Sequence, residues 1–280
     1  TVIRPAMAPI EMRVGVRSAI VGSHRPGPDD LKPARADLSL KPVSDRPAAM
    51  AHRVVVRLDG AISVVNQFPA LAGLDLEIAE GEIVLIQGPN GAGKSTLLRL
   101  CAGLAPLTAG SGRVLDFDLA DGEQRRQLRR QTGLLAHETY LYDELTVEEN
   151  VGFWAEANRV DPQSIEPVLD RLELGTRLRT VRVSDLSAGQ RRRTSLAVMV
   201  CRRPRLWLLD EPHGGLDPAG RDLVDGLIGH AIRFGATVVF ASHDLERASS
   251  VATRTVTISG GRAIGPTSPR TTTGGDLDAS

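Results

Sequence analysis

Lysine, cysteine and aromatic residues are scarce in this sequence. Only three of the 34 basic residues are lysines, namely Lys32, Lys41 and Lys94, and 34 acidic residues bring the formal net charge to zero. Without a general basic field, nucleic acid is not expected as a partner. The two cysteines, Cys101 and Cys201, lie in apolar surroundings, which indicates buried thiols and argues against a disulfide scaffold or a cysteine metal site.

Long apolar runs are also missing. No stretch approaches the roughly 18 to 20 residues that cross a bilayer, and no apolar core of a secretory signal is visible near the N-terminus. We therefore expect a cytoplasmic protein, whose membrane-spanning helices, if it acts at a membrane, belong to another chain. At 41% apolar residues, the 280-residue chain can still bury the core of one large or two small domains.

Both ends of the sequence have the composition of disordered segments. Residues 1–52 hold 7 of the 17 prolines and no sustained periodicity, so we expect a disordered leader there. Because Met50 precedes the first strand-like run, residues 1–49 are alternatively an upstream extension of a true start near Met50. Residues 263–280 are expected to form a disordered polar tail. A folded domain over residues 53–262 remains.

Strand and helix patterns alternate within this domain. Apolar runs bounded by breakers predict strands at residues 53–58, twice within 74–88, at 206–210 and at 236–242. A helix is expected to begin at Lys94 or Ser95. Residues 121–204 are expected to be mostly helical, with an inserted helical subdomain over about 138–204. The pattern predicts an α/β fold with a parallel or mixed sheet core.

The sharpest motif is GPNGAGKST, which has the form G-x-x-x-x-G-K-S and lies between an apolar strand and a helix. Its glycines let the backbone curl so that successive N–H groups and the positive end of the helix dipole face one concavity, which selects polyphosphate. Lys94 is expected between the β- and γ-phosphates, and the Ser95 hydroxyl is expected on Mg²⁺. The candidate binding residues are Gly88, Pro89, Asn90, Gly91, Ala92, Gly93, Lys94, Ser95 and Thr96.

The second element is LWLLDEPHGGLDP, residues 206–218. A buried strand that ends in a carboxylate delivers Asp210 to the carboxyl edge of the sheet, where it can hold Mg²⁺ through water. Glu211 follows and can face the attacking water as a general base, a role that contributes about 10²- to 10⁴-fold to a rate.

LSAGQ, residues 186–190, completes a set of five motifs. Together with GPNGAGKS, LLDEP, GGLD and ASHD, it resembles the ATPase subunit of an ATP-binding cassette (ABC) transporter over about residues 53–262. The resemblance implies a P-loop NTPase fold, an ABC-type nucleotide-binding domain, and hydrolysis of ATP with Mg²⁺. It also implies a second ABC ATPase subunit, in a homodimer that sandwiches the nucleotides.

Further site residues follow from this resemblance. In the family's dimer, Ser187 and Gly189 of one subunit close over the γ-phosphate held by the other. Because LSAGQ starts a predicted helix, its free N–H groups and the positive end of the helix dipole can face an anion. His243 in ASHD matches the switch histidine that contacts the γ-phosphate and supports Glu211. Asp217 in GGLD matches the loop that communicates across the dimer.

Two positions depart from the family's pattern. Alignment of residues 133–150 puts His137 where the family usually has glutamine, although a carbonyl oxygen suits Mg²⁺ better than an imidazole nitrogen does. His137 is therefore either a metal-site residue or one that couples movement of the helical subdomain to the site without ligating the metal. The aromatic residue that usually stacks on adenine aligns with Val65, and Phe68 is the alternative base contact. With 3% aromatic residues overall, we expect modest discrimination between ATP and GTP.

Membrane-spanning permease subunits are the partners that the resemblance implies, which places the protein peripherally at the cytoplasmic face of the cell membrane. Tyr140, Tyr142, Phe153 and Trp154 are four of the nine aromatic residues, an enrichment suited to a groove for a permease's cytoplasmic helix. Alternatively, Phe153 and Trp154 form the core of the helical subdomain, and exposure of the aromatic residues would favour the groove.

Three features of the sequence indicate which kind of ABC protein it resembles most. One nucleotide domain and no long coiled-coil insertion favour a transporter subunit over the tandem ribosome-associated or chromosome-organising members. The run from LSAGQ to GGLD and the turn LTVEEN resemble the ATPase of the haem exporter used in cytochrome c biogenesis. Haem export is therefore expected, with export of another small molecule or a slow-hydrolysing ATP-dependent dimerisation switch as alternatives. An intact Glu211 and His243 argue against the switch.

Overall fold

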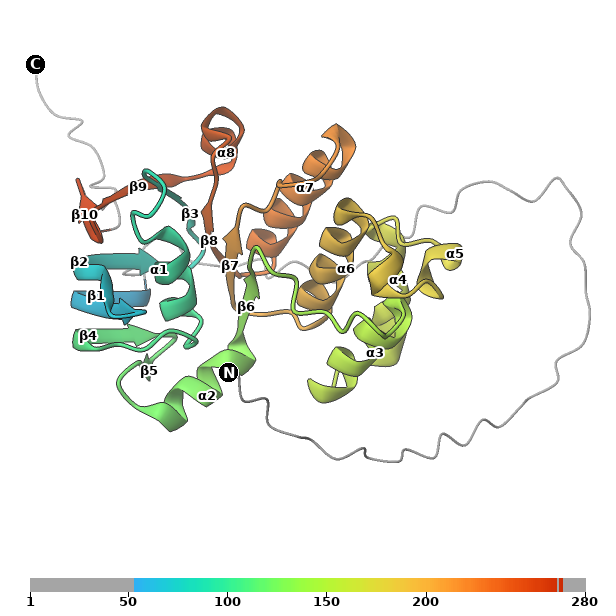
Figure 1. The fold of residues 1–280 in the computed structure, drawn as a ribbon, viewed down its shortest axis with the longest axis horizontal. Helices are drawn as coiled ribbons and strands as arrows, with labels where there is room; N and C mark the ends of the chain where they lie inside the picture. The colour runs from blue at the N-terminus through green and yellow to red at the C-terminus, as the bar shows by residue number, and fades with distance from the viewer. Residues whose placement is uncertain (1–52, 266, 269–280) are drawn as a thin grey trace, which may run out of the picture. The chain divides into compact units, whose positions relative to one another are not determined.

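The computed structural model describes residues 53–265 and 267–268, which build two sheets and a group of helices (Figure 1). The expected leader at 1–52 and most of the expected tail lie outside these residues. One sheet has four antiparallel strands in the order β2-β1-β4-β5. Its strands are β1 (Val54–Val65), β2 (Phe68–Ala79), β4 (Ala109–Val114) and β5 (Phe117–Asp118).

The six-stranded sheet has the order β10-β9-β3-β8-β7-β6. Its strands are β3 (Ile83–Gln87), β6 (Thr132–Leu135), β7 (Leu206–Asp210), β8 (Thr237–Ala241), β9 (Arg254–Ser259) and β10 (Arg262–Ile264). All neighbours run parallel except β10, which pairs antiparallel with β9. The mixed sheet predicted from the sequence is thereby confirmed, and the carboxyl ends of its parallel strands share one edge.

Helix α1 (Lys94–Cys101) lies between the two sheets and contacts strands of both (Figure 1). Leu97, Leu98 and Leu100 are fully buried in the cluster that joins α1 to β1, β2 and β7. Burial of each such side chain stabilises the fold by about 1.5–3 kcal/mol. The start of α1, which carries the end of the phosphate motif, is therefore anchored by a packed core.

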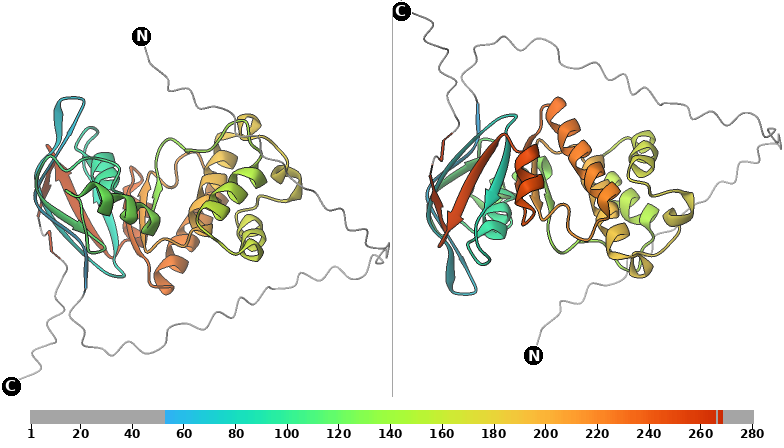
Figure 2. Two further views of the ribbon diagram at one scale, coloured as in Figure 1. Left: turned by 90° about the horizontal axis from the view of Figure 1, so that it is seen from below. Right: turned by 90° about the horizontal axis from the view of Figure 1, so that it is seen from above.

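The remaining helices are α2 (Gly122–Gln131), α3 (Val147–Ala157), α4 (Ile165–Arg171), α5 (Thr176–Arg179), α6 (Ala188–Cys201), α7 (Pro218–Arg233) and α8 (Leu245–Val251). Of these, α2 contacts β5 and β6, and the others cover the face of the six-stranded sheet that is turned away from α1 or extend from it. Helix α6 packs against α3, α4 and β6, and both views of Figure 2 place α3–α6 at the opposite end from the antiparallel sheet. These four helices form the helical group that the sequence predicts.

The sequence misses strand β6, and one boundary that it predicts is wrong. Residues 132–135 fall within the segment expected to be mostly helical, but they form strand β6, because the short run TGLL can pair with the buried strand β7. The folded part also continues beyond 262. Ala263 and Ile264 pair with β9, and the Thr267 carbonyl accepts a hydrogen bond from the Glu77 N–H at 2.8 Å.

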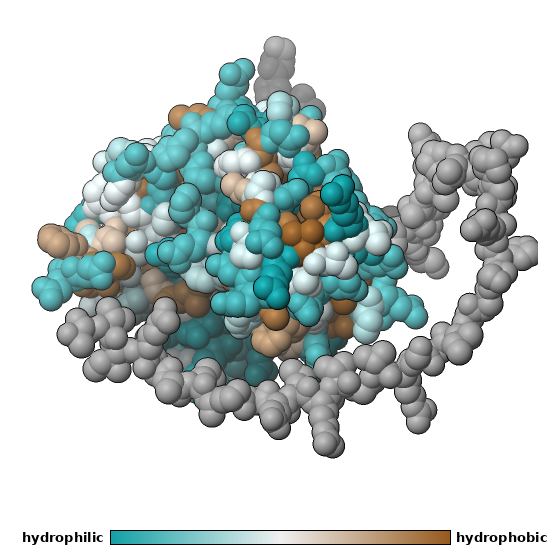
Figure 3. All heavy atoms as spheres, turned by 45° about the vertical axis from the view of Figure 1, so that its right-hand side comes forward, coloured by the Kyte–Doolittle hydropathy of each residue, from teal (hydrophilic) through white to brown (hydrophobic). Residues whose placement is uncertain are grey.

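The face of the molecule in Figure 3 is mainly hydrophilic, with hydrophobic residues reaching the surface in small groups. Within residues 53–265, no helix has both the length and the apolar character that a membrane crossing requires.

Candidate functional site

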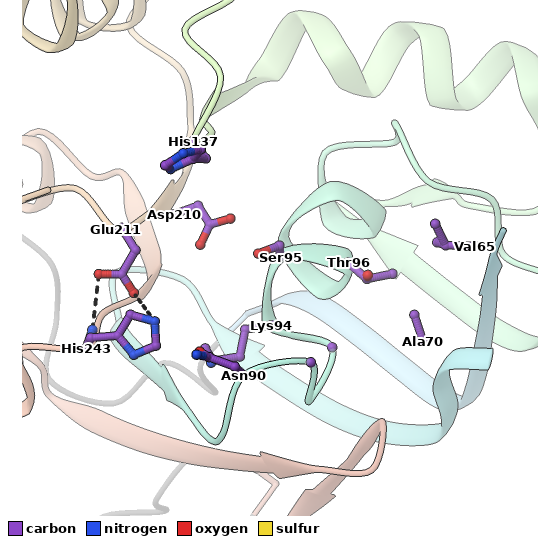
Figure 4. Close-up of a pocket in the computed structure, with 12 residues that line it drawn as sticks. Val65, Ala70, Asn90, Lys94, Ser95, Thr96, His137, Asp210, Glu211 and His243 are labelled. Atoms are coloured by element: carbon purple, nitrogen blue, oxygen red, sulfur yellow. Dashed lines mark hydrogen bonds and ion pairs between the residues drawn. The ribbon is translucent and has the colours of Figure 1, made fainter. Parts of the chain in front are cut away.

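A pocket of about 460 Å³ lies where the carboxyl ends of β6 and β7 approach the start of α1 (Figure 4). It brings together residues from five segments that are distant in the sequence. Its lining is Val65, Ala70, Asn90, Gly91, Gly93, Lys94, Ser95, Thr96, His137, Asp210, Glu211 and His243. Most of the residues predicted for the phosphate loop and for catalysis therefore share one cavity.

Gly88 and Gly93 pack too closely against other backbone segments to carry a side chain. A Cβ atom on Gly88 would lie 2.1 Å from the Ile258 carbonyl oxygen, and one on Gly93 would lie 2.5 Å from the Ala70 carbonyl oxygen. Both have positive φ angles, 147° and 106°, which glycine adopts at little cost. The loop is thereby held as a tight curl before α1, the shape that a polyphosphate requires.

Lys94 is held against the inside of this loop. Its Nζ donates hydrogen bonds to the carbonyl oxygens of Gly88 at 2.7 Å and Pro89 at 3.0 Å. The residue is only 8% exposed, and its side chain runs beside Asn90 in Figure 4. The ammonium group is thus confined to a narrow position at the mouth of the loop, where it can meet phosphate oxygens.

Ser95 and Asp210 face each other across the pocket (Figure 4). Ser95 belongs to the first turn of α1, and Asp210 ends the buried strand β7. No group of three His, Cys, Asp or Glu residues within the described part of the chain could hold a metal alone. One hydroxyl and one carboxylate nevertheless fit Mg²⁺, because this ion usually binds one or two protein oxygens and takes its remaining ligands from phosphates and water.

Glu211 and His243 form a pair beside these residues. Glu211 Oε2 accepts a hydrogen bond from the His243 backbone N–H at 3.1 Å, and Glu211 Oε1 lies 3.5 Å from His243 Nε2. Oε1 is buried without a hydrogen-bond partner among the described residues, so it can accept a proton or a hydrogen bond from a water molecule. Glu211 also has a φ angle of 49°, a strained conformation that is typical of functional sites.

The ABC transporter family profile matches residues 71–214, about half of the chain and most of this site. The chain belongs to the ABC transporter family. Two relatives are the human ATP-binding cassette sub-family A member 10, 30% identical over 81% of this chain, and the sulfate/thiosulfate import ATP-binding protein CysA 1 of Agrobacterium fabrum, 36% identical over 74%. The chain spans 15% of the length of the first and 61% of the second.

Solved structures agree with this ABC assignment. One described as the ATP-binding subunit of an ABC transporter has a TM-score of 0.69 and 26% identity, covering 75% of this chain and 88% of its own. A dimeric ATP-binding cassette, MJ0796, bound to ADP and inorganic phosphate, has a TM-score of 0.69 and 26% identity, covering 74% and 96%. The P-loop ABC fold predicted from the sequence is thereby confirmed.

Ser187 and Gly189 of this ABC domain lie outside the pocket, at the start of α6. The Ser187 hydroxyl accepts a hydrogen bond from the Gln190 N–H at 3.3 Å, and Gln190 Oε1 accepts one from the Ser187 N–H at 2.9 Å. This capping box starts α6 and leaves the N–H groups of its first residues pointing out of the helix end. Asp217 similarly caps α7 by accepting a hydrogen bond from the Gly220 N–H at 3.1 Å.

Phe68 is not a pocket residue, contrary to the expectation that it contacts the base. It lies at the start of β2, opposite Val65 across a tight turn, and is 76% exposed. Val65 and Ala70, from the ends of β1 and β2 beside this turn, line the pocket instead (Figure 4). Ala70 was not predicted, since an alanine in a strand carries no functional signal. His137 lies beyond the end of β6 near Asp210, and its role as a metal ligand stays a prediction.

Proposed function

We propose that this chain is the ATP-hydrolysing subunit of an ABC transporter. The observation that carries the proposal is the pairing of Glu211 with His243, beside Asp210 and opposite the phosphate loop. A loop that only binds nucleotide needs the curl and Lys94. The strained Glu211, whose buried Oε1 has no hydrogen-bond partner among the described residues, lies beside the His243 imidazole. This arrangement is typical of a site that also activates water.

Each residue has a defined task in this mechanism. The loop N–H groups and Lys94 hold the phosphates, while Ser95 and Asp210 hold Mg²⁺, which neutralises phosphate charge when bound. Glu211 accepts a hydrogen bond from the attacking water through Oε1 and orients it toward the γ-phosphate. The His243 N–H fixes the other oxygen of Glu211, so that the carboxylate cannot rotate away, and its ring can reach the γ-phosphate.

A homodimer would complete this site. The relative MJ0796 is described as a dimer bound to ADP and inorganic phosphate, and this chain has the same fold. The Gly189 N–H and the Ser187 hydroxyl, both at the start of α6, can donate hydrogen bonds to an anion. They lie outside their own pocket, as expected if they serve the nucleotide of a second copy.

A second hollow, of about 810 Å³, fits docking of a permease segment. It lies between α6 and the chain after β6 and includes Tyr140, Tyr142 and Trp154. Tyr140, Tyr142 and Phe153 are 52%, 43% and 44% exposed, and the rings of Tyr142, Phe153 and Trp154 lie within 5.2–6.4 Å of one another. The exposure of Phe153 favours the groove over the core interpretation for that residue, whereas Trp154 is half-buried. A permease docked here would place the chain peripherally at the cytoplasmic face of a membrane.

Haem, exported for cytochrome c biogenesis, is the substrate that we propose on sequence likeness alone. The support is the run from LSAGQ to GGLD and the turn LTVEEN, whereas the relative CysA 1 is named for sulfate/thiosulfate import. Co-purification with a native permease, followed by haem measurement in vesicles with and without ATP, tests this assignment. Transport of another small molecule by that complex would contradict haem export and leave the ATPase role intact.

The ATPase role is tested by comparing the wild type with Glu211→Gln, each with and without the permease. Replacing the carboxylate should lower the steady-state rate by about 10²-fold or more and should leave ATP binding intact, so that the variant forms an ATP-dependent dimer. Glu156→Gln, an exposed site on α3, is the matched control and should keep the wild-type rate. Equal rates in the wild type and Glu211→Gln would favour the ATP-dependent switch instead.

A further inference from the structure

Arg192 is a buried arginine of α6 that makes no ion pair within the described residues. It is 6% exposed, and its guanidinium donates hydrogen bonds only to backbone carbonyls there. One terminal nitrogen donates to Ala136 O at 2.6 Å, and the other donates to Asp210 O and Glu211 O, both at 2.6 Å. Burial lowers the pKa of Arg192 to about 10, although the nearby charges of Asp210 and Glu211 raise it.

These three carbonyls belong to the chain segments that build the pocket. Ala136 precedes His137, and the other two carbonyls belong to the carboxylate residues at the end of β7. The planar guanidinium therefore joins the ends of two neighbouring strands at a fixed separation. It also holds the carbonyl of Glu211, whose backbone has the strained φ angle of 49°.

The same helix holds the other side of His137. Ser195 Oγ, three residues after Arg192, donates a hydrogen bond to Thr139 O at 3.2 Å. Helix α6 begins at the LSAGQ motif and lines the second hollow through Ser195. A shift of α6 would consequently move His137 and Glu211 together.

A structural role alone explains this arrangement poorly. Burying a cation without an ion-pair partner costs free energy, and an apolar side chain would avoid that cost only by leaving these carbonyls without this donor. The two-pronged shape of arginine is needed only if the separation of these carbonyls matters.

We propose that Arg192 is a positioning residue, which holds the Glu211 carboxylate in its water-activating place and links that place to α6. This inference rests on the proposed ATPase function. Arg192 does not line the nucleotide pocket, so its loss should lower the rate of the chemical step and leave nucleotide affinity unchanged. A lysine keeps the charge but can present only one ammonium point to three carbonyls.

The test compares Arg192→Lys and Arg192→Gln with the wild type in the full chain. Small misplacements of a catalytic group cost up to about 10²-fold, and we expect kcat to fall by at least about tenfold with KM for ATP within about twofold. Arg191→Lys, on the same helix and paired with Asp143, is the matched control and should keep the wild-type kcat. In a Glu211→Gln background, Arg192→Lys should change the residual single-turnover rate by less than about twofold. The reason is that both changes remove the same function, activation of water by the Glu211 carboxylate.

Any different result would contradict the positioning role. A wild-type kcat in Arg192→Lys would overturn it alone, and so would a further drop in the Glu211→Gln background. Misfolding of both Arg192 variants, followed by circular dichroism, would show that the residue serves the fold. Absence of ATP hydrolysis in the wild type would overturn the proposed function, and the positioning role with it.

Discussion

The backbone N–H of His243 and the carboxylate of Glu211 meet at 3.1 Å, although 32 residues separate them in the sequence. They meet because β7 and β8 are parallel neighbours whose carboxyl ends share one edge of the sheet. The backbone N–H, not the ring alone, therefore fixes one Glu211 oxygen. Residue 243 thus contributes a backbone N–H, which every amino acid except proline supplies, and an imidazole, which only histidine supplies.

His243→Ala separates these two contributions. It keeps the backbone N–H to Glu211 and removes the ring, so ATP binding should persist while hydrolysis falls by at least about tenfold. Phosphate release and equilibrium ATP binding, measured on the same preparation, check this. His230→Ala, on α7 away from the pocket, should leave the rate unchanged. A normal rate in His243→Ala would show that the ring takes no part.

His137→Gln should keep ATPase activity. A glutamine carbonyl oxygen suits Mg²⁺ better than an imidazole nitrogen does, and changes around a metal site that disturb it typically cost about 10- to 100-fold. Steady-state ATPase of the purified complex is the measurement. A loss greater than about tenfold would mean that the imidazole has a task that an amide cannot perform.

The sequence predicts the central parallel strands β3, β7 and β8 and part of β1 and β2, and it misses strands in both sheets. Strands such as Leu206–Asp210 are continuous apolar runs, a pattern that predicts a buried parallel strand. Strand β4 reads AGSGRV, with little apolar pattern, and it exists because Val56 of β1 pairs with Val114. Strand β9 was not predicted although Val256 and Ile258 alternate with polar residues, a pattern that indicates a strand.

Discrimination between ATP and GTP should be modest. Stacking of a base on an aromatic ring contributes about 1–3 kcal/mol, and Val65 offers no ring while Phe68 lies outside the pocket. Competition between the two nucleotides should give apparent affinities within about tenfold, and Phe68→Ala should change them by less than about twofold. Val65→Tyr should tighten ATP binding. A strong preference for adenine in the wild type would contradict the role given to Val65.

The two cysteines should be unreactive in the folded chain. Burial raises the pKa of the Cys101 thiol to about 12 and that of Cys201 to about 11. At pH 8 a thiol reagent should label neither until urea unfolds the protein. A raised thiol pKa favours the folded state below the ordinary value of 9.0, and this contribution is lost as pH rises toward the folded values. Rapid labelling of the folded chain at pH 8 would show that a thiol is accessible.

Part of the candidate site is visible as sequence motifs, and part is assembled only when the chain folds. The loop from Gly88 to Thr96 is contiguous, so its curl and its lysine are visible in the sequence. Arg192 was not predicted, because it lies within a run of three arginines, and nothing in that run distinguishes the buried one. Only the fold brings it to Ala136, which precedes it by 56 residues.

At Lys94, a matched exchange of one cation for another isolates the role of the side chain. Its Nζ lies 2.7 Å and 3.0 Å from two loop carbonyl oxygens. A planar, longer guanidinium would not fit that position between the loop and the phosphates. Arg126→Lys, the reverse exchange on the exposed face of α2, is the control and should leave activity unchanged.

The phosphate-release rate of Lys94→Arg at saturating Mg²⁺ and ATP is the most direct test of ATP hydrolysis at this loop. We expect a rate about 10²- to 10³-fold below that of the wild type, the usual cost of losing one group that stabilises transition-state charge. A rate within about twofold of the wild type would contradict it.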